Sequence, residues 1–391
     1  RADLFIAVTP NVSENLTCAM LAKQLGAKHT VARVDNYEYM KPANLELFKG
    51  LGIESLIYPE LLAAEDIQAS SRYSWVRQLW EFNNGELLLL SVKMHDAHPI
   101  YEKEISNKDN LLVGHTLKEI GMTHGHNFHV VAIKRDGETV SPHGDEQILP
   151  RDLVFFMTTK ENIPYIRKIV GKEHYTDVKN VIMMGGGKTT VRAALTTPDY
   201  MHVKIIEKDA KRCERLNELL ENQDTMVIHG DGRDLGLLEE EGIRNTQAFV
   251  ALTENAETNI LACLTAKKMG VRKTIAMVEN LDYVSMAESL DIGTIINKKT
   301  IAASHIYQML LDADVNNLRS LMIVDSNVAE FTAAEGSKVT KKPVKDLGLP
   351  FGVTIGGLVR NGVGMLVNGN SQIEAGDSVM VFCHEQKLNN I

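Results

Sequence analysis

The sequence has few of the features that mark secreted, membrane-spanning or metal-binding proteins. Among its 391 residues there are only four cysteines, and none are in a C-x-x-C spacing: Cys18, Cys213, Cys263 and Cys383. This pattern disfavours a disulfide framework or a zinc site, and it favours a reducing compartment with thiols buried for packing. The most apolar runs, residues 87–92 and 353–359, have the length of a strand and fall far short of the roughly 20 residues that span a bilayer.

An excess of positive charge is also missing. The formal net charge is −9 at pH 7, which argues against nucleic acid as a partner because such proteins usually present a basic face. The content of 44% hydrophobic and 24% charged residues is ordinary for a globular protein. At roughly 100–200 residues per domain, the length predicts two to four domains.

The chain repeats itself. The segment that begins "AVTPNVSENLTCAM" at Ala7 returns as "ALTENAETNILACL" at Ala251, an offset of 251 − 7 = 244 that places Thr9 opposite Thr253. A shorter second repeat places Arg135 opposite Arg360 and Asp152 opposite Asp377. The layout predicts two units, each with a longer N-lobe followed by a shorter C-lobe. The expected ranges are 1–84 (first N-lobe), 85–172 (first C-lobe), 173–318 (second N-lobe) and 319–391 (second C-lobe).

The two kinds of lobe have different patterns. In the second N-lobe, short β-branched strands alternate with helices of about ten residues, which predicts a Rossmann-like, doubly wound parallel sheet in an α/β fold. The C-lobes carry short strands separated by Gly, Asn and Asp turns, which predicts small β-rich α+β lobes with one helix around residues 344–348. Aromatic residues at helical spacing in "YSWVRQLW", residues 73–80, suggest a helical packing or subunit-contact surface.

The offset has a consequence for the first N-lobe. The strand at Val181 would have its counterpart at position 181 − 244 = −63, so the first N-lobe lacks a glycine loop and a second strand. Half of a parallel sheet leaves an unpaired edge. We therefore expect that the natural protein continues upstream.

The clearest candidate site is the "VIMMGGGKTT" segment between a predicted strand and a predicted helix. Gly185, Gly186 and Gly187 let the backbone approach a pyrophosphate, with Lys188 and Thr189 opening a helix whose N–H groups favour an anion. Thr190 stands where the third glycine of G-x-G-x-x-G is expected, and its β-branched side chain predicts crowding between helix and strand. The alternative is a glycine turn that serves sheet packing alone.

A carboxylate supports the ligand interpretation. Glu207 ends the strand "HVKIIE" twenty residues after Gly187, where it could accept hydrogen bonds from ribose hydroxyls and repel a 2′-phosphate. NAD(H), or ATP or ADP, is thus favoured over NADP. In "HGDGRD", Asp231 and Gly232 could line an adenine pocket, or could form a plain Asx turn.

The fourth strand and its repeat supply the remaining candidates. Thr253 and Glu254 lie at the predicted strand-order reversal, where ligands bind, although the same segment could equally cap a helix. Thr9 and Pro10 take this place in the first N-lobe. Arg33 ends the next strand there and either contacts an anion or is a surface charge; its counterpart is Met277.

A histidine cluster, His124, His126 and His129, is better explained as loop histidines before a strand than as metal ligands, because no cysteine or convincing acid accompanies it.

With these segments, the sequence resembles the regulatory subunits of bacterial and archaeal Trk potassium-uptake systems, which consist of tandem regulator-of-potassium-conductance (RCK) domains. The resemblance rests on the two N-lobe–C-lobe units and on the series "GGGKTT…KIIEKD…IHGDGRD…ALTENAETNILACL". It implies a cytoplasmic protein, peripheral on the inner face of the plasma membrane, that assembles into a ring as a homodimer or homotetramer. The implied partner is a membrane-embedded potassium channel or transport subunit, and the implied ligand is NAD(H) or ATP/ADP.

Carried onto this chain, the resemblance assigns residues 185–189 to phosphates, Glu207 to ribose, and Thr253 with Glu254 to the nicotinamide-side ribose. The first N-lobe would keep only Thr9, Pro10 and Arg33. No histidine–carboxylate arrangement follows the second N-lobe to serve as a catalytic acid and base, and the C-lobes are short for a substrate domain. We therefore expect a nucleotide sensor and no enzyme. The alternatives are an NAD-dependent oxidoreductase, an RCK module of another cation channel or antiporter, and a scaffold whose nucleotide site has decayed.

Overall fold

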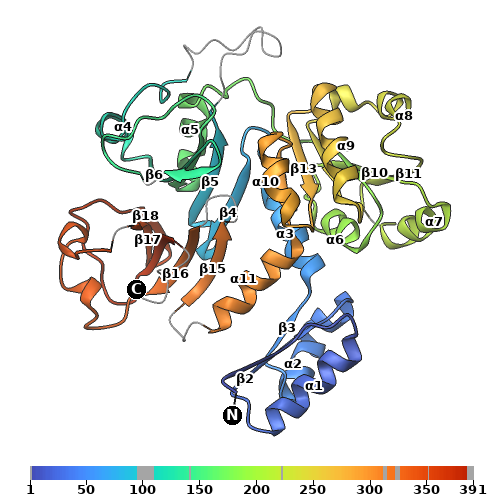
Figure 1. The fold of residues 1–391 in the computed structure, drawn as a ribbon, viewed down its shortest axis with the longest axis horizontal. Coiled ribbons are helices and arrows are strands. Elements are labelled where there is room, and N and C mark those ends of the chain that lie inside the picture. The colour runs from blue at the N-terminus through green and yellow to red at the C-terminus, as the bar shows by residue number, and fades with distance from the viewer. Residues whose placement is uncertain are drawn as a thin grey trace.

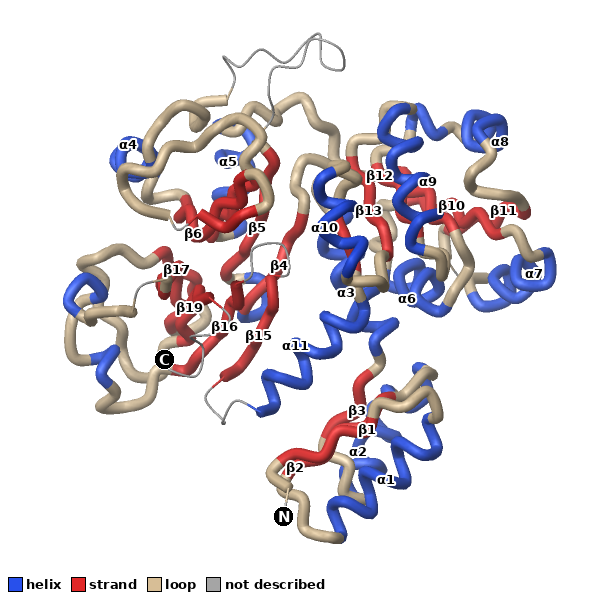
Figure 2. Tube along the Cα trace, viewed as in Figure 1, coloured by secondary structure: helices blue, strands red, loops and turns tan. Residues whose placement is uncertain are grey.

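Four sheets, each with its own helices or turns, make up the computed structural model of the chain (Figure 1; Figure 2). It describes residues 2–94, 110–140, 142–221, 223–310, 315–321, 326–350 and 352–384. The two parallel sheets belong to the N-lobes and the two antiparallel sheets to the C-lobes, as the sequence predicts.

The first N-lobe has a small parallel sheet in the order β1-β2-β3. Its elements are β1 (Leu4–Ala7), α1 (Val12–Gln24), β2 (His29–Arg33), η1 (Tyr37–Met40), α2 (Pro42–Gly50), β3 (Ser55–Ile57) and α3 (Pro59–Ser71). Helix α3 leaves this lobe and packs on α6 and α11 of the second N-lobe, with Ala63, Ala64 and Ile67 in the core of that lobe (Figure 1).

The second N-lobe has six parallel strands in the order β11-β10-β9-β12-β13-β14. The strands are β9 (Asn180–Met184), β10 (His202–Glu207), β11 (Thr225–His229), β12 (Ala248–Ala251), β13 (Lys273–Met277) and β14 (Thr294–Ile296). The helices are α6 (Lys188–Thr196), α7 (Ala210–Leu219), α8 (Leu235–Glu240), α9 (Ala256–Lys268), α10 (Asp282–Ser289) and α11 (Lys298–Leu310). The strand order reverses between β9 and β12, so the loops that follow these two strands lie where doubly wound folds bind ligands.

The C-lobes are two five-stranded antiparallel sheets, ordered β4-β5-β8-β6-β7 and β15-β16-β19-β17-β18. The first contains β4 (Gln78–Phe82), η2 (Asn83–Gly85), β5 (Leu87–Lys93), α4 (Leu117–His124), β6 (Phe128–Arg135), β7 (Glu138–Val140), β8 (Leu153–Thr158) and α5 (Ile163–Ile169). The second contains β15 (Val315–Leu321), β16 (Ser326–Thr332), η8 (Val344–Asp346), β17 (Val353–Arg360), β18 (Val363–Leu366) and β19 (Ser378–His384). The two sheets share one apolar core, in which Phe82 and Phe155 of the first meet Val359 and Phe382 of the second.

The C-lobe repeat is confirmed by one arrangement that occurs twice. Arg135 donates through Nε and a terminal nitrogen to Asp152, at 2.9 and 2.8 Å, and Arg360 donates in the same way to Asp377, at 2.8 and 2.7 Å. In each lobe the aspartate also accepts a backbone N–H three residues earlier, at 2.8 Å. Each bidentate pair joins the turn before one strand, β8 or β19, to the end of the strand beside it, β6 or β17.

Several sequence expectations need correction. Residues 73–80 form no helix, because α3 ends at Ser71 and β4 begins at Gln78; Trp75 and Trp80 are nevertheless buried, as a packing role requires. The helix expected around residues 344–348 is only the short 3₁₀ turn η8. Of the four cysteines, Cys18 is exposed and Cys213, Cys263 and Cys383 are buried, so only these three thiols serve packing.

Two expected lobe boundaries fall inside sheet elements. The boundary between residues 84 and 85 lies within the β4–β5 hairpin, and the one between 318 and 319 lies within β15. In both cases a C-lobe strand starts before the position where the repeat alignment placed it.

Candidate functional site

The glycine turn connects β9 to α6 and uses its three glycines differently. Gly185 has φ +98°, a conformation that favours glycine, and a Cβ there would lie 3.1 Å from the Thr253 backbone nitrogen. Gly186 is buried, and a Cβ on it would lie 2.6 Å from a Leu216 methyl group. A Cβ on Gly187 would meet no described atom within 4 Å. Gly187 is therefore the position at which a ligand can approach the backbone.

Thr190 does not crowd the turn. Its buried hydroxyl donates a hydrogen bond of 2.6 Å to the Gly185 carbonyl oxygen, which ties the first turn of α6 to the strand end. The sequence predicts crowding of helix and strand at this residue, and the structure instead gives Thr190 a specific contact that a glycine could not make. Thr189 is also buried, so Lys188 is the exposed residue of the pair.

Helix α6 begins without a side-chain cap. The helices that follow β10, β11 and β12 are each capped, by Asp209, Asp234 and Asn255 respectively. The first N–H groups of an α-helix have no partner within the helix, and together with the helix dipole they favour an anion. Of these four helices, α6 is thus the one whose first N–H groups receive no side-chain cap and are left to a ligand or water.

Glu207 is held against the glycine turn. One carboxylate oxygen accepts the Gly186 N–H at 2.6 Å and the other accepts the Asp209 N–H at 2.9 Å. The side chain is only 3% exposed, with an Arg212 guanidinium nitrogen 3.6 Å away. The carboxylate thus lies beside the turn, and its expected contact with ribose hydroxyls stays a prediction.

Asp231 and Gly232 follow β11 and form the Asx turn that was one of the two expectations. Asp231 accepts the backbone N–H of Arg233 at 3.0 Å and also binds the Arg233 guanidinium. Hydrogen bonds from Arg233 lower the pKa of Asp231 to about 2. Gly232 packs on Met184, whose Cγ would lie 2.4 Å from an added Cβ. This contact explains the glycine without a ligand.

Thr253 lies on the opposite side of the turn, and hydrogen bonds to the buried Asn259 hold it in place. Asn259 Oδ1 accepts both the Thr253 N–H, at 3.0 Å, and the Thr253 hydroxyl, at 2.7 Å. Its amide group donates to the Thr253 and Met277 carbonyl oxygens, each at 2.8 Å. The Thr253 hydroxyl is therefore engaged within the protein, while the neighbouring Glu254 is exposed.

The first N-lobe repeats this arrangement with Thr9 and Asn15. Asn15 Oδ1 accepts the Thr9 N–H and hydroxyl at 2.8 and 2.9 Å, and its amide donates to the Thr9 and Arg33 carbonyl oxygens. Pro10 is exposed and Arg33 is partly buried at the end of β2. The ends of β1 and β2 thus bring together Thr9, Pro10 and Arg33 at one edge of the sheet. In the described part of the lobe, no glycine turn lies beside them.

Sequence analysis missed a contact between the two N-lobes. The Lys188 ammonium, at the start of α6, donates to the Asp35 backbone oxygen at 2.8 Å and to its carboxylate at 2.9 Å. Asp35 follows β2 and lies 153 residues earlier in the chain. Neither repeat nor motif signals this pair, since it forms only when α3 brings the first N-lobe against α6.

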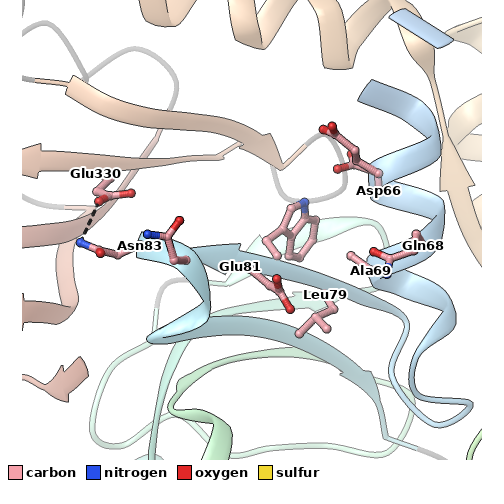
Figure 3. Close-up of a pocket in the computed structure, with 10 residues that line it drawn as sticks. Asp66, Gln68, Ala69, Leu79, Glu81, Asn83 and Glu330 are labelled. Carbon is pink, nitrogen blue, oxygen red and sulfur yellow. Dashed lines mark hydrogen bonds between the residues drawn. The ribbon is translucent and has the colours of Figure 1, made fainter. Parts of the chain in front are cut away.

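A separate pocket of about 580 Å³ lies between α3, the β4–η2 hairpin and β16 (Figure 3). Its walls carry the carboxylates of Asp66, Glu81 and Glu330, and it shares no residue with the glycine turn. Glu330 accepts hydrogen bonds from Ser378 at 2.6 Å and Asn83 at 3.4 Å.

The three histidines of the cluster do not lie together in one loop. Within the described residues, no group of three or more His, Cys, Asp or Glu side chains is placed to hold a metal ion. His124 ends α4 and its Nδ1 lies 2.5 Å from the Tyr165 hydroxyl, and His129 lies within β6. Only His126 is in the loop where all three were expected. In the same part of the chain, no helix combines the length and apolar character needed to cross a membrane.

Comparison with known proteins agrees with the geometry. The TrkA-N domain matches residues 1–59 and 181–298, and the TrkA-C domain matches residues 104–171 and 328–391. The chain is 29% identical over 394 residues to the Trk system potassium uptake protein TrkA of Halomonas elongata, covering 99% of this chain and 82% of that protein. It is 26% identical to the TrkA homolog of Archaeoglobus fulgidus, covering 100% of this chain and 85% of that protein.

Solved structures share the fold. The crystal structure of the GsuK RCK domain aligns with a TM-score of 0.55 and 13% identity, covering 100% of this chain and 79% of that one. The GsuK channel bound to NAD aligns with a TM-score of 0.54 and 14% identity, covering 100% of this chain and 66% of that one.

Proposed function

Since the chain belongs to the TrkA family, with TrkA-N and TrkA-C domains that each match twice, we propose that it is a nucleotide-sensing regulatory subunit of a potassium-uptake system. Its partner is a membrane-embedded potassium channel or transport subunit. The chain acts from the cytoplasmic side, peripheral on the inner face of the plasma membrane, and assembles into a ring as a homodimer or homotetramer.

The observation that carries the nucleotide proposal is the uncapped start of α6 behind an open Gly187, at the point where the strand order reverses. The phosphates of NAD(H), or of ATP or ADP, bind the N–H groups of residues 187–189, where the helix dipole favours negative charge. The Lys188 ammonium adds an opposite charge. A channel whose structure was solved bound to NAD has the same fold, which supports a dinucleotide as the class of ligand.

The nucleoside ends lie on the flanking loops. Glu207 accepts hydrogen bonds from one ribose, Asp231 and Gly232 border the adenine, and Glu254 beside Thr253 borders the second ribose. Thr9, Pro10 and Arg33 form the corresponding edge of the first N-lobe. The exposure of Glu254 supports its assignment.

The ligand acts by shifting a population of lobe arrangements and undergoes no reaction. A nucleotide can shift such an equilibrium only by its difference in affinity for the two states, commonly about 1–3 kcal/mol in allosteric proteins. Helix α3 gives this shift a route, since it joins the first N-lobe to the core beneath α6. The carboxylates of Glu207 and Asp231 are both engaged in internal hydrogen bonds, which disfavours either of them as a catalytic acid or base.

Calorimetric titration with NADH, NAD⁺, ATP and ADP tests the site. Gly187→Val fills the open position with a β-branched residue that suits the extended backbone there, φ −75° and ψ 178°. We expect it to abolish binding while thermal unfolding of the unliganded chain is unchanged. Glu207→Gln replaces one of the two oxygens that accept the Gly186 and Asp209 N–H groups by an NH2 donor, so it should weaken binding through the turn as well as through the contact to ribose. At a hundredfold excess over Kd, the bound nucleotide should stabilise the unmodified chain by about 2.7 kcal/mol.

Unchanged affinity in Gly187→Val would exclude this turn as the ligand site. Solution scattering with and without nucleotide tests the lobe shift, and an identical profile would exclude it. Steady oxidation of NADH with added substrates would reveal an enzyme instead.

A further inference from the structure

Lys188 lies next to the proposed phosphate position and also makes the contact between the two N-lobes. It is the first residue of α6, directly after Gly187, and its ammonium binds both the carboxylate and the backbone oxygen of Asp35. The same side chain is therefore next to the proposed phosphate position and is the link to the first N-lobe.

The contact extends one turn along α6. The guanidinium carbon of Arg192 lies 4.4 Å from the ring centroid of Tyr37, two residues after Asp35. Burial, with the nearby carboxylates of Glu60 and Asp35, raises the pKa of Tyr58 to about 12. Polar groups of the first N-lobe thus face a basic edge of α6, above the apolar contact that α3 makes.

In the Lys188–Asp35 pair, the anionic partner of Lys188 can be replaced at little cost. A cation in the first turn of a helix is unfavourably placed with respect to the helix dipole and gains from an anionic partner. Both side chains are exposed, and ion pairs at the surface contribute little to stability because water screens them. Replacing Asp35 by a phosphate group therefore costs little and supplies more negative charge.

We propose that Lys188 is a coupling residue that Asp35 and the nucleotide phosphates share in competition. Without nucleotide, Lys188 holds residues 35–37 against α6. With nucleotide bound, the ammonium turns to the phosphates and the first N-lobe is released at this point, while α3 keeps the lobes joined. The inference rests on the proposed function and assigns its regulation to a specific pair.

A double-mutant cycle with NADH as the probe tests the competition in the full chain. Asp35→Asn removes the competing charge and should tighten NADH binding about two- to fivefold, the range that exposed ion pairs allow. Lys188→Gln should weaken binding, and adding Asp35→Asn to it should then change nothing. Asp3→Asn is the matched control, because Asp3 forms a surface ion pair with Lys28, at 2.6 Å, within the first N-lobe.

Hydrogen–deuterium exchange supplies a readout of the lobe contact. NADH should speed amide exchange in residues 35–40 of the unmodified chain, and Asp35→Asn should show the faster exchange without ligand. Unchanged NADH affinity in Asp35→Asn, with normal binding by the unmodified chain, would overturn the coupling and leave the nucleotide site intact. Absence of NADH binding by the unmodified chain would overturn both proposals.

Discussion

The two N-lobes contain the same half of a sheet in different surroundings. With the offset of 244, β1 (Leu4–Ala7), α1 (Val12–Gln24) and β2 (His29–Arg33) coincide end for end with β12 (Ala248–Ala251), α9 (Ala256–Lys268) and β13 (Lys273–Met277). In the second N-lobe β12 pairs with β9 on its other side. In the described residues of the first N-lobe, β1 pairs with β2 alone.

The difference shows what local sequence determines and what the rest of the sheet must supply. The hydrogen bonds of Asn15 and Asn259 are alike, so the loop after the strand folds from nearby residues in either setting. Burial is not alike: Val8 is 48% exposed, whereas its counterpart Leu252 is 3% exposed. A repeated motif therefore does not imply a repeated ligand site.

The largest expected difference between the lobes concerns these two side chains. Leu252→Ala leaves a cavity in the core beneath α6 and should cost about 2–5 kcal/mol of unfolding free energy. Val8→Ala removes a side chain that is half exposed and should change stability by no more than about 0.5 kcal/mol. Urea unfolding of both variants measures this. Equal losses would show that β1 is buried as deeply as β12 in solution.

The buried asparagines should instead behave alike. Asn259→Ala leaves the Thr253 N–H and the Met277 carbonyl oxygen without partners, at a cost of about 2–3 kcal/mol. Asn15→Ala removes the same contacts from Thr9 and Arg33, and we expect a loss of similar size. A much smaller loss in Asn15→Ala would mean that the first loop is held by other contacts.

A smaller effect depends on pH. Lys267 pairs with Asp291, which also binds Arg77, and the equivalent Lys23 pairs with Glu54. Burial alone raises carboxyl pKa values, yet the neighbouring cations leave the pKa of both Asp291 and Glu54 below the usual range. Such groups stabilise the fold fully above the unfolded-state pKa of about 4, and the contribution is lost as the pH falls through the folded-state pKa.

Asp291→Asn should therefore cost about 1 kcal/mol at pH 7, and Glu54→Gln less, since water screens both partly exposed pairs. Urea midpoints at pH 7 and pH 3 check this: the difference from the unmodified chain should shrink in acid. A difference that grows in acid would contradict the assigned sign.

Much of the fold could be predicted because it depends on local patterns. The alternating strands and helices of the second N-lobe and the glycine turn follow from spacing within one lobe. The repeat alignment matched Arg135 with Arg360 and Asp152 with Asp377, but the ion pairs that these residues form within each lobe were not predicted. Prediction failed where pairing or docking with another segment decides the outcome. Residues 73–80 carry helical spacing, but pairing of β4 with β5 overrides it.

The site divides in the same way. Gly187 and Glu207 could be found from the G-x-G turn and the acid that ends the next strand. The separate tasks of Gly185 and Gly186 depend on Thr253 and Leu216, which belong to other elements. The role of Asp35 could not be predicted from the sequence, because its contact with Lys188 requires the docking of one lobe on another.

The number of nucleotides bound per chain tests the central claim most directly, because in the part of the chain that the structure describes the first N-lobe has no glycine turn like that of the second. Titration with NADH should give one equivalent per chain, lost in Gly187→Val. The affinity should be kept in Arg33→Met, which places in the first N-lobe the residue found at 277. Two equivalents, no binding, or binding that survives Gly187→Val and fails in Arg33→Met would contradict the account.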